Sequence, residues 1–292
     1  MSILVTGGTG TIGTQVLKQL QERGSEVRAL TRSPGKSPLP SGVTPIRGDL
    51  ADVDSVRAAL EGVSALFLLV PNVADELTQA MLALTVAREG GVKGIVYLSV
   101  IKGEEYVDVP HFASKHLVER MINALELPAT VLRPTYFIQN DIRMKDPLLR
   151  FGIYGMPIGS KGVAMVDIRD IGEAAAIELM RRERSVEPLG SETYTLAGPD
   201  SLTGEAIAAI WSEALGRPIR YGGDDLTAME QRLKKTMQAW HALDLRLMMG
   251  RYQSDGAVAT ADDMARLTAL LGHAPRSYRD FAKDAAAQWA KG

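Results

Sequence analysis

The chain has 292 residues, enough for one large domain or two coupled ones. It carries 33 Lys and Arg against 35 Asp and Glu, and this net charge of −2 argues against a nucleic-acid-binding protein that depends on a basic excess. The lack of cysteine excludes disulfides and thiol nucleophiles, and the four histidines form no HExxH pair, so we expect no metal. No apolar run is long enough to cross a bilayer, and no basic segment typical of a secretory signal opens the chain. We therefore expect a soluble, cytoplasmic protein.

The first half alternates short apolar runs with amphipathic stretches. Strands are expected at 3–5, 27–30, 43–46, 65–70, 94–98 and 129–132. Helices are expected between them, at 11–23, 53–60, 77–87 and 112–125. Gly24 directly follows the first of these helices and Gly62 ends the second, as a glycine commonly does after a helix. Because strands and helices alternate with short links, this half predicts an α/β fold with a doubly wound parallel sheet.

The second half is mainly helical. Short strand-like pieces are expected at 162–166, 192–196 and 219–221. Helices are expected at 170–182, 204–215, 227–249, 262–271 and 278–290. An acid three residues after Thr227, Thr260 and Ser277 predicts helix caps at these positions, with the full capping box at Thr227, where the acid is a glutamate.

The segment between the first strand and the first helix is rich in glycine. Gly7 permits the tight turn, Gly10 lets backbone N–H groups approach a pyrophosphate, and Gly13 lets the helix pack closely on the strand. The helix N-terminus adds the positive end of its dipole. Thr9, Thr11 and Ile12 belong to the same expected cofactor site. The alternative is a glycine-rich turn in a protein that binds no nucleotide.

The end of the second strand favours NADP(H) as the cofactor. NAD-specific sites place an acid here for the ribose 2′-hydroxyl, but this chain has Arg32 and Ser33, which suit a 2′-phosphate. Arg32 could otherwise be a solvated loop residue. After the third strand, Asp49 is placed to accept a hydrogen bond from an adenine amino group, with Leu50 beside it. The alternative for Asp49 is an N-cap for the helix that follows.

Several segments together resemble the NmrA-like atypical short-chain dehydrogenase/reductases. In the first half these are Val5–Gly13 (VTGGTGTIG), Arg32–Pro34 (RSP), Gly48–Leu50 (GDL) and Leu132–Asn140 (LRPTYFIQN). In the second half they are Val166–Ile171 (VDIRDI), Tyr194–Pro199 (YTLAGP), Ala214–Ile219 (ALGRPI) and Pro275–Phe281 (PRSYRDF). The resemblance covers nearly the whole chain and is more specific for fold and cofactor than for substrate.

The resemblance implies an NADP-binding Rossmann domain over residues 1–135 and a smaller substrate-binding region over 136–292, mainly helical and interleaved with the Rossmann sheet. The family includes NADPH-dependent quinone, azo-dye and triphenylmethane reductases. It also includes redox-sensing regulators that bind the dinucleotide without turning it over.

The resemblance also assigns residues around the nicotinamide. It places Val70 and Pro71, at the end of the fourth strand, under the cofactor. It places Ser99, at the end of the fifth strand, beside the nicotinamide. It assigns the lining of the nicotinamide pocket to Pro134, Thr135 and Tyr136.

The catalytic residues are expected at His111 and Lys115. Ordinary short-chain reductases use a tyrosine as proton donor and a lysine four residues later that holds the ribose; here the lysine is kept and a histidine replaces the tyrosine. Residues four apart share a helical face, so both can reach the nicotinamide. A histidine can act as an acid near neutral pH. The alternatives are that His111 has only a structural role and that Lys115 is a surface lysine. Tyr106 and Tyr136 offer other hydroxyl groups that could donate the proton.

Methionines and a tryptophan on the helix expected at 227–249 suggest a plastic cap over a flat aromatic substrate. The alternative, core packing or a dimer contact, is the better interpretation for most of them. The sequence thus predicts an NADPH-dependent reductase that passes hydride to a quinone, a dye or a polycyclic aromatic ketone. Its competitor is a dinucleotide-sensing regulator without turnover. The expected partner is a small aromatic molecule, with no nucleic acid or membrane, in a monomer or homodimer.

Overall fold

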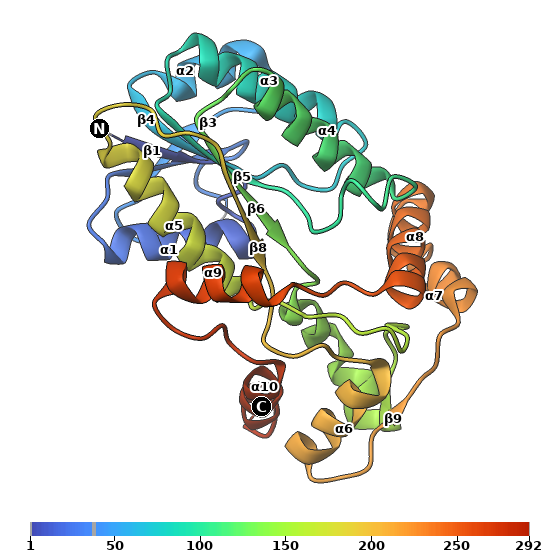
Figure 1. The fold of residues 1–292 in the computed structure, drawn as a ribbon. Coiled ribbons are helices and arrows are strands. Elements are labelled where there is room, and N and C mark those ends of the chain that lie inside the picture. The colour runs from blue at the N-terminus through green and yellow to red at the C-terminus, as the bar shows by residue number, and fades with distance from the viewer. Residues whose placement is uncertain (1, 37–38, 292) are drawn as a thin grey trace.

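The computed structural model describes residues 2–36 and 39–291, and its main feature is one seven-stranded parallel sheet (Figure 1). The strand order is β3-β2-β1-β4-β5-β6-β8. The strands are β1 Ser2–Val5, β2 Val27–Thr31, β3 Thr44–Arg47, β4 Val63–Leu68, β5 Gly94–Leu98, β6 Ala129–Pro134 and β8 Glu192–Leu196. The chain leaves β1 toward β2 and β3, then crosses back to β4, which confirms the predicted doubly wound topology.

Helices cover both faces of this sheet (Figure 1). One layer holds α2 Val53–Leu60, α3 Glu76–Glu89 and α4 Pro110–Ala124, and the other holds α1 Thr11–Glu22, α5 Ile168–Arg184 and α9 Ala261–Leu271. Every residue of β4 is buried, because a strand in the middle of such a sandwich has no solvated face. Within the described ranges, we find no helix long and apolar enough to span a membrane.

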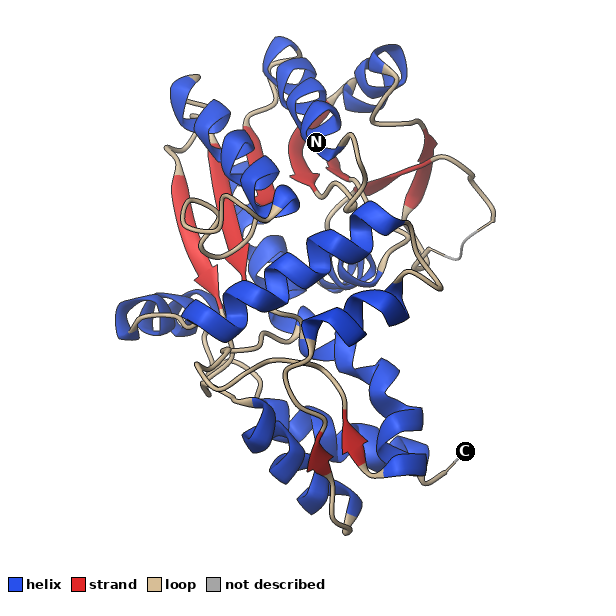
Figure 2. Cartoon of the chain, turned by 90° about the vertical axis from the view of Figure 1, so that its right-hand side faces the viewer, coloured by secondary structure: helices blue, strands red, loops and turns tan. Residues whose placement is uncertain are grey.

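The rest of the second half forms a separate layer beyond the carboxyl ends of the strands. It contains the 3-10 helix η1 Ile138–Met144, the π-helix η2 Pro147–Phe151, and helices α6 Gly204–Leu215, α7 Leu226–Leu233, α8 Ala239–Asp255 and α10 Tyr278–Trp289. Two short strands, β7 Ile153–Tyr154 and β9 Arg220–Tyr221, pair with each other, and Figure 2 shows this small sheet well apart from the large one.

The second half is interleaved with the first, because β8 pairs along β6 as the seventh strand while α5 and α9 cover one face of the sheet. The strand expected at 162–166 is wrong. Val163 forms isolated bridges with Leu202 and Ala257, and Val166 bridges Phe137, so the segment changes partner within a few residues.

The helix expected at 227–249 is also wrong, since it is two helices, α7 and α8, that pack on each other. The chain reverses between them so that Met229 from α7 and Met248 and Met249 from α8 join one core. The caps differ from expectation as well. Asp225, not Thr227, caps α7 by accepting from the Ala228 N–H at 2.8 Å, and the full capping box forms at Thr260 with Asp263.

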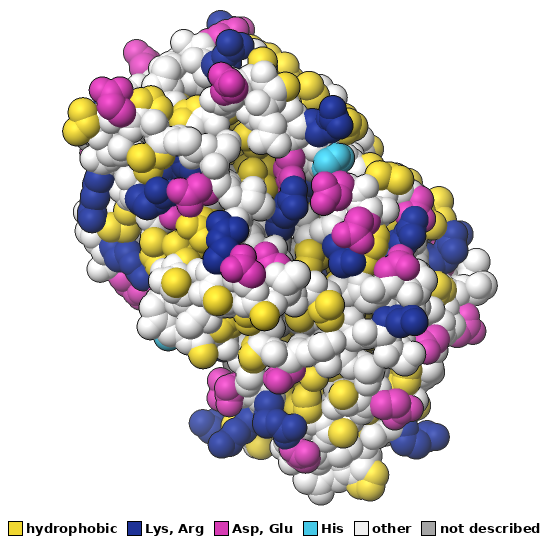
Figure 3. Space-filling model, viewed as in Figure 1, with side chains coloured by type: hydrophobic (Ala, Val, Ile, Leu, Met, Phe, Trp, Pro, Cys, Tyr) yellow, Lys and Arg dark blue, Asp and Glu magenta, His cyan; other side chains and the backbone are white. Residues whose placement is uncertain are grey.

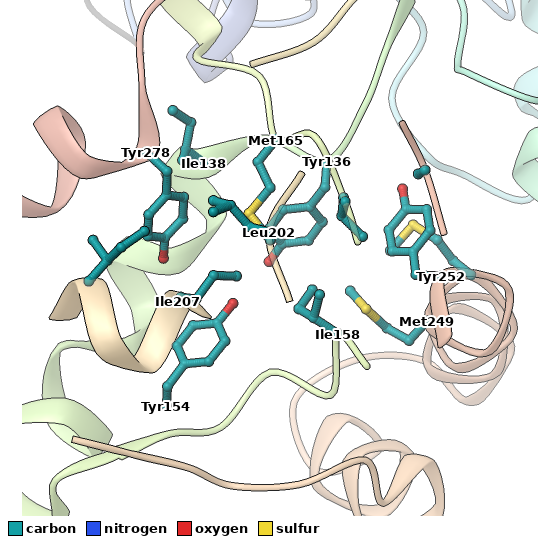
Figure 4. Close-up of a cluster of buried hydrophobic side chains, with 14 of the residues drawn as sticks. Tyr136, Ile138, Tyr154, Ile158, Met165, Leu202, Ile207, Met249, Tyr252 and Tyr278 are labelled. Atoms are coloured by element: carbon teal, nitrogen blue, oxygen red, sulfur yellow. The ribbon is translucent and has the colours of Figure 1, made fainter. Parts of the chain in front are cut away.

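A buried carboxyl group joins three elements of the second half. The Asp141 side chain accepts hydrogen bonds from the hydroxyls of Tyr136 at 2.9 Å, Tyr154 at 2.8 Å and Tyr278 at 2.6 Å. Figure 4 shows these three hydroxyls directed toward one another. Burial raises the pKa of Asp141 to about 6, although the three hydrogen bonds oppose this shift.

The Asp141 carboxyl predicts a specific dependence of stability on pH. Its pKa in the folded chain lies about two above the ordinary Asp value, which corresponds to about 3 kcal/mol. Between these two pKa values the folded chain binds more protons than the unfolded chain, so this stability is present at about pH 4 and is lost as the pH rises through 6.

In the Asp141→Asn variant the amide at this position does not titrate. The difference in unfolding free energy between the wild type and this variant is therefore expected to fall by about 3 kcal/mol from pH 4 to pH 7. Urea unfolding at a series of pH values measures this difference. Parallel pH profiles for the two proteins would contradict the assignment.

Candidate functional site

A pocket of about 530 Å³ opens at the carboxyl ends of the strands, where the sheet order reverses. Its walls come from the segments that follow β1, β2, β3 and β4, together with Gln79 of α3. Crevices at this position are where open parallel sheets bind ligands. Of the expected site residues, it is lined by Gly7, Thr9, Gly10, Arg32, Ser33, Asp49, Leu50 and Pro71.

The glycine loop has the geometry of an anion cradle. Gly7 has a φ of +65°, a conformation that other residues rarely adopt. A Cβ on Gly13 would lie 2.2 Å from the Gly7 carbonyl oxygen, so only glycine fits there. Gly10 lines the pocket and is the N-cap of α1, with no side chain capping the helix. The free N–H groups of the first helical turn are therefore left for a ligand.

The cationic side of the pocket holds two residues, of which the sequence reasoning named one. Arg32 and Lys36 both line the pocket and are exposed, and within residues 2–36 and 39–291 neither forms an ion pair. At the end of β2, where NAD-specific sites have an acid, this chain has Thr31 and then Arg32. Lys36 lies one position beyond Gly35 in the same loop, and its spacing from Arg32 could have indicated it.

Asp49 is not the N-cap of α2. Asp52 caps that helix through the N–H groups of Asp54 and Ser55, whereas the Asp49 side chain, among the described residues, accepts only from the Ala51 N–H, at 3.0 Å. The alternative interpretation of Asp49 is therefore wrong, and its second carboxylate oxygen remains available at the pocket wall.

The remaining loop and strand-end residues lie outside the pocket lining: Thr11, Ile12, Gly13, Val70, Ser99, Pro134, Thr135 and Tyr136. Several of their side chains already have partners. The Ser99 hydroxyl donates to Glu119, the Thr135 hydroxyl to the Ala164 carbonyl, and the Tyr136 hydroxyl to Asp141. A cofactor could meet these residues through their backbone or ring faces, and their role in binding it stays a prediction.

His111 and Lys115 each meet a buried carboxylate from another element. The Lys115 ammonium lies 2.6 Å from Glu76 of α3 and donates to the Leu98 carbonyl at 3.4 Å. The His111 Nδ1 lies 2.5 Å from Asp244 of α8. Both side chains are only 11–12% exposed, so α4 presents its His and Lys to a largely enclosed space.

Asp244 is itself almost fully buried and receives three groups. Besides the imidazole, it accepts from the His111 backbone N–H at 3.1 Å and from the Asn72 side-chain amide at 3.2 Å. Burial favours protonation, but these hydrogen bonds and the charge of His111 outweigh it and hold the pKa of Asp244 below its ordinary value. Sequence reasoning missed Glu76, Asn72 and Asp244, since no local pattern links them to α4.

Tyr106, one of the spare hydroxyls, is fully buried and donates to the Gly256 carbonyl. Burial raises its pKa, so it is a poor proton donor. The methionines of α7 and α8 that were considered for a substrate cap are buried in the second-half core at Met229, Met248 and Met249. For these three, core packing is the better interpretation.

Comparison with known proteins agrees with this geometry. The model of the NmrA-like family matches residues 1–260. The NAD(P)H azoreductase of Xenophilus azovorans is 30% identical over 290 residues, covering 98% of both chains.

Two solved structures share the fold. The NADPH-dependent quinone oxidoreductase QOR2 of Escherichia coli, solved with NADPH, superimposes with a TM-score of 0.83 at 22% identity and covers 97% of this chain and 99% of that one. NmrA, a negative transcriptional regulator solved with NADP, gives 0.80 at 18% identity and covers 100% of this chain and 97% of that one. The family match and the azoreductase similarity show that this chain belongs to the NmrA-like family.

Proposed function

We propose that this protein is an NADPH-dependent reductase whose acceptors are quinones, azo or related dyes, or polycyclic aromatic ketones. One observation carries the proposal: a glycine cradle for a pyrophosphate lies in a pocket that Arg32 and Lys36 also line, with no acid at the end of β2. That combination suits a dinucleotide with a 2′-phosphate. The azoreductase, which covers nearly the whole chain, supports an NAD(P)H-dependent oxidoreductase.

The residues present fit the cofactor. The N–H groups at the start of α1 would receive the pyrophosphate, Arg32 and Lys36 the 2′-phosphate, and Asp49 the adenine amino group. When bound, the dinucleotide supplies hydride. A dinucleotide is longer than this pocket, so its nicotinamide end would lie beyond it. There Lys115 of α4 could bind the nicotinamide ribose. An ammonium group has three N–H donors, so Lys115 can keep Glu76 and still bind a hydroxyl.

The acceptor class follows from the proton donors of the chain. Tyr106 and Tyr136 are buried and already hydrogen-bonded, which leaves His111 as the available acid on α4. A quinone or azo group accepts hydride readily and needs less help from an acid than a plain ketone. The surface in Figure 3 mixes charges of both signs, with no broad basic area on that face for a nucleic acid.

A second candidate is a dinucleotide-sensing regulator, favoured by the structural likeness to NmrA. The two candidates differ in turnover. The reductase is expected to oxidise many equivalents of NADPH in the presence of menadione or methyl red, which is followed by the loss of absorbance of NADPH. Tight binding of NADPH by calorimetry with no oxidation by any acceptor would favour the regulator.

Gly10→Val is expected to fold and to lose cofactor binding. A Cβ at Gly10 meets only the Gly7 carbonyl oxygen, at 3.3 Å, so the fold can accept it, but a branched side chain fills the space that the pyrophosphate needs. Circular dichroism checks the fold, and calorimetric titration with NADPH measures binding. A folded variant that binds NADPH as the wild type does would place the dinucleotide elsewhere.

Arg32→Ala and Lys36→Ala are each expected to weaken NADPH binding about tenfold or more, because a charge-assisted contact contributes about 1.5–3 kcal/mol. Binding of NADH is expected to stay nearly unchanged, since it has no 2′-phosphate. Lys18→Ala, an exposed lysine of α1 outside the pocket, is the matched control. Equal losses for both cofactors would exclude a 2′-phosphate contact.

A further inference from the structure

Side chains from three distant parts of the chain meet at one buried carboxylate, that of Asp244. His111 is in the first turn of α4, Asp244 is in α8, and Asn72 lies between β4 and α3. The His111 Nδ1 and the Asn72 amide both meet the same Asp244 oxygen, Oδ2, at 2.5 and 3.2 Å. The other oxygen, Oδ1, accepts the His111 backbone N–H at 3.1 Å. The carboxylate therefore holds both the backbone and the ring of His111.

This close contact favours one of the two neutral tautomers of His111. Asp244 is 1% exposed, and its pKa lies below the ordinary value, so it is ionised at neutral pH and can only accept. An unprotonated Nδ1 would set its lone pair against a carboxylate oxygen 2.5 Å away, so the distance favours the ring with Nδ1–H, although in this orientation the N–H bond is not directed at that oxygen. The other nitrogen, Nε2, has no hydrogen-bond partner in the part of the chain that the structure describes, so a proton carried there can move.

Other charged groups near the ring are already paired. On α4 itself Lys115 meets Glu76 from α3. Asp108, which precedes α4, forms an ion pair with Arg251 of α8 at 2.7 Å. The ring of Phe112 packs edge-on against the imidazole, with centroids 4.6 Å apart. Among the described residues, Asp244 is thus the charged group that forms an ion-pair contact with the imidazole.

We propose that Asp244 is a positioning residue that fixes the ring orientation and tautomer of His111, so that His111 donates its Nε2 proton to the acceptor during reduction. This inference rests on the proposed reductase function. The acceptor gains a hydride and a proton, which together reduce it by two electrons. The imidazolium breaks its Nε2–H bond, the acceptor oxygen or nitrogen forms the new bond, and the neutral ring regains a proton from water. Asp244 stays ionised throughout.

The first experiment reads the tautomer directly in the wild-type protein without cofactor. Nitrogen-15 NMR of histidine-labelled protein in alkaline buffer distinguishes Nδ1–H from Nε2–H imidazole, and only four histidines are present. The signal lost in His111→Phe identifies His111. We expect the Nδ1–H form in the wild type and a shift to the Nε2–H form in Asp244→Asn, since an amide can donate to Nδ1. An Nε2–H wild-type ring would overturn the proposal.

The second experiment separates positioning from stability. With a polycyclic ketone as acceptor, Asp244→Asn is expected to lower kcat by roughly 10²–10⁴-fold, the range of general acid catalysis. The KM for NADPH is expected to stay within about twofold. The double variant with His111→Phe should be no slower than His111→Phe alone, because the two residues act as one unit. Additive losses would show that Asp244 acts independently of His111.

Asp108→Asn is the matched control, since it removes the other carboxylate bridge to α8 without touching the imidazole. It should leave kcat unchanged. A loss equal to that of Asp244→Asn would mean that the bridge to α8, rather than the imidazole contact, matters, and would overturn the proposal.

The outcomes for this inference and for the proposed function are distinct. If the wild type turns over NADPH while Asp244→Asn retains full kcat on the ketone, the positioning role is overturned and the reductase stands. If the wild type oxidises no NADPH with any acceptor, the reductase and the proton transfer both fail, although the NMR tautomer still reports the contact.

Discussion

The placement of the site depends on the close contact between the end of β1 and the start of α1. A Cβ on Gly13 would approach the Gly7 carbonyl to 2.2 Å, so any side chain there would force α1 away from the sheet. The same helix packs tightly on α5, where a Cβ on Gly172 would lie 2.7 Å from the Cβ of Gln15. Two glycines thus fix α1 on two sides, and the N–H groups at its start take their position from both.

The packing of α1 on α5 also affects the edge of the sheet formed by β6 and β8. Helix α5, held against α1 by Gly172, carries Glu178 and Arg182, which bind the Thr130 hydroxyl of β6 at 2.6 and 2.7 Å. Arg182 also binds the carbonyls that precede β8. The second half of the chain therefore supplies both the last strand of the sheet and the helix that holds it to β6, which is why the two halves are interleaved.

Local periodicity explains how much of the fold could be predicted. Strands β1 to β6 and helices α1 to α4 lie within two residues of expectation at every end, because their patterns are short and their glycine stops are local. The region 227–249 failed because an apolar period continues through a chain reversal, which the sequence does not mark. The capping box at Thr227 failed because Asp225 lies two residues earlier and competes for the same helix start.

The residues of the site also fall into those that local sequence could predict and those that only the tertiary structure shows. The glycine loop, Arg32, Asp49 and Pro71 follow successive strands, so the rule that parallel strands end at one edge brought them together. Asp244 is 133 residues from His111, and Glu76 comes from another helix, so only the tertiary structure could show that both residues of α4 have carboxylate partners.

These carboxylates bear on the replacement of tyrosine by histidine. A phenol loses its proton near pH 10 in water, so as a proton donor it depends on a nearby cation that stabilises the phenolate. Here the cation that could serve, Lys115, is bound to Glu76, and its charge is largely compensated. A phenol at position 111 would also lie against the ionised Asp244, which would oppose its ionisation.

An imidazole reverses this relation, because its charged form is the protonated one and a neighbouring carboxylate stabilises it. Histidine at 111 and the acid at 244 are therefore mutually consistent, whereas tyrosine with that acid is not. The substitution and the two buried carboxylates are best understood as one arrangement for supplying a proton without a phenol.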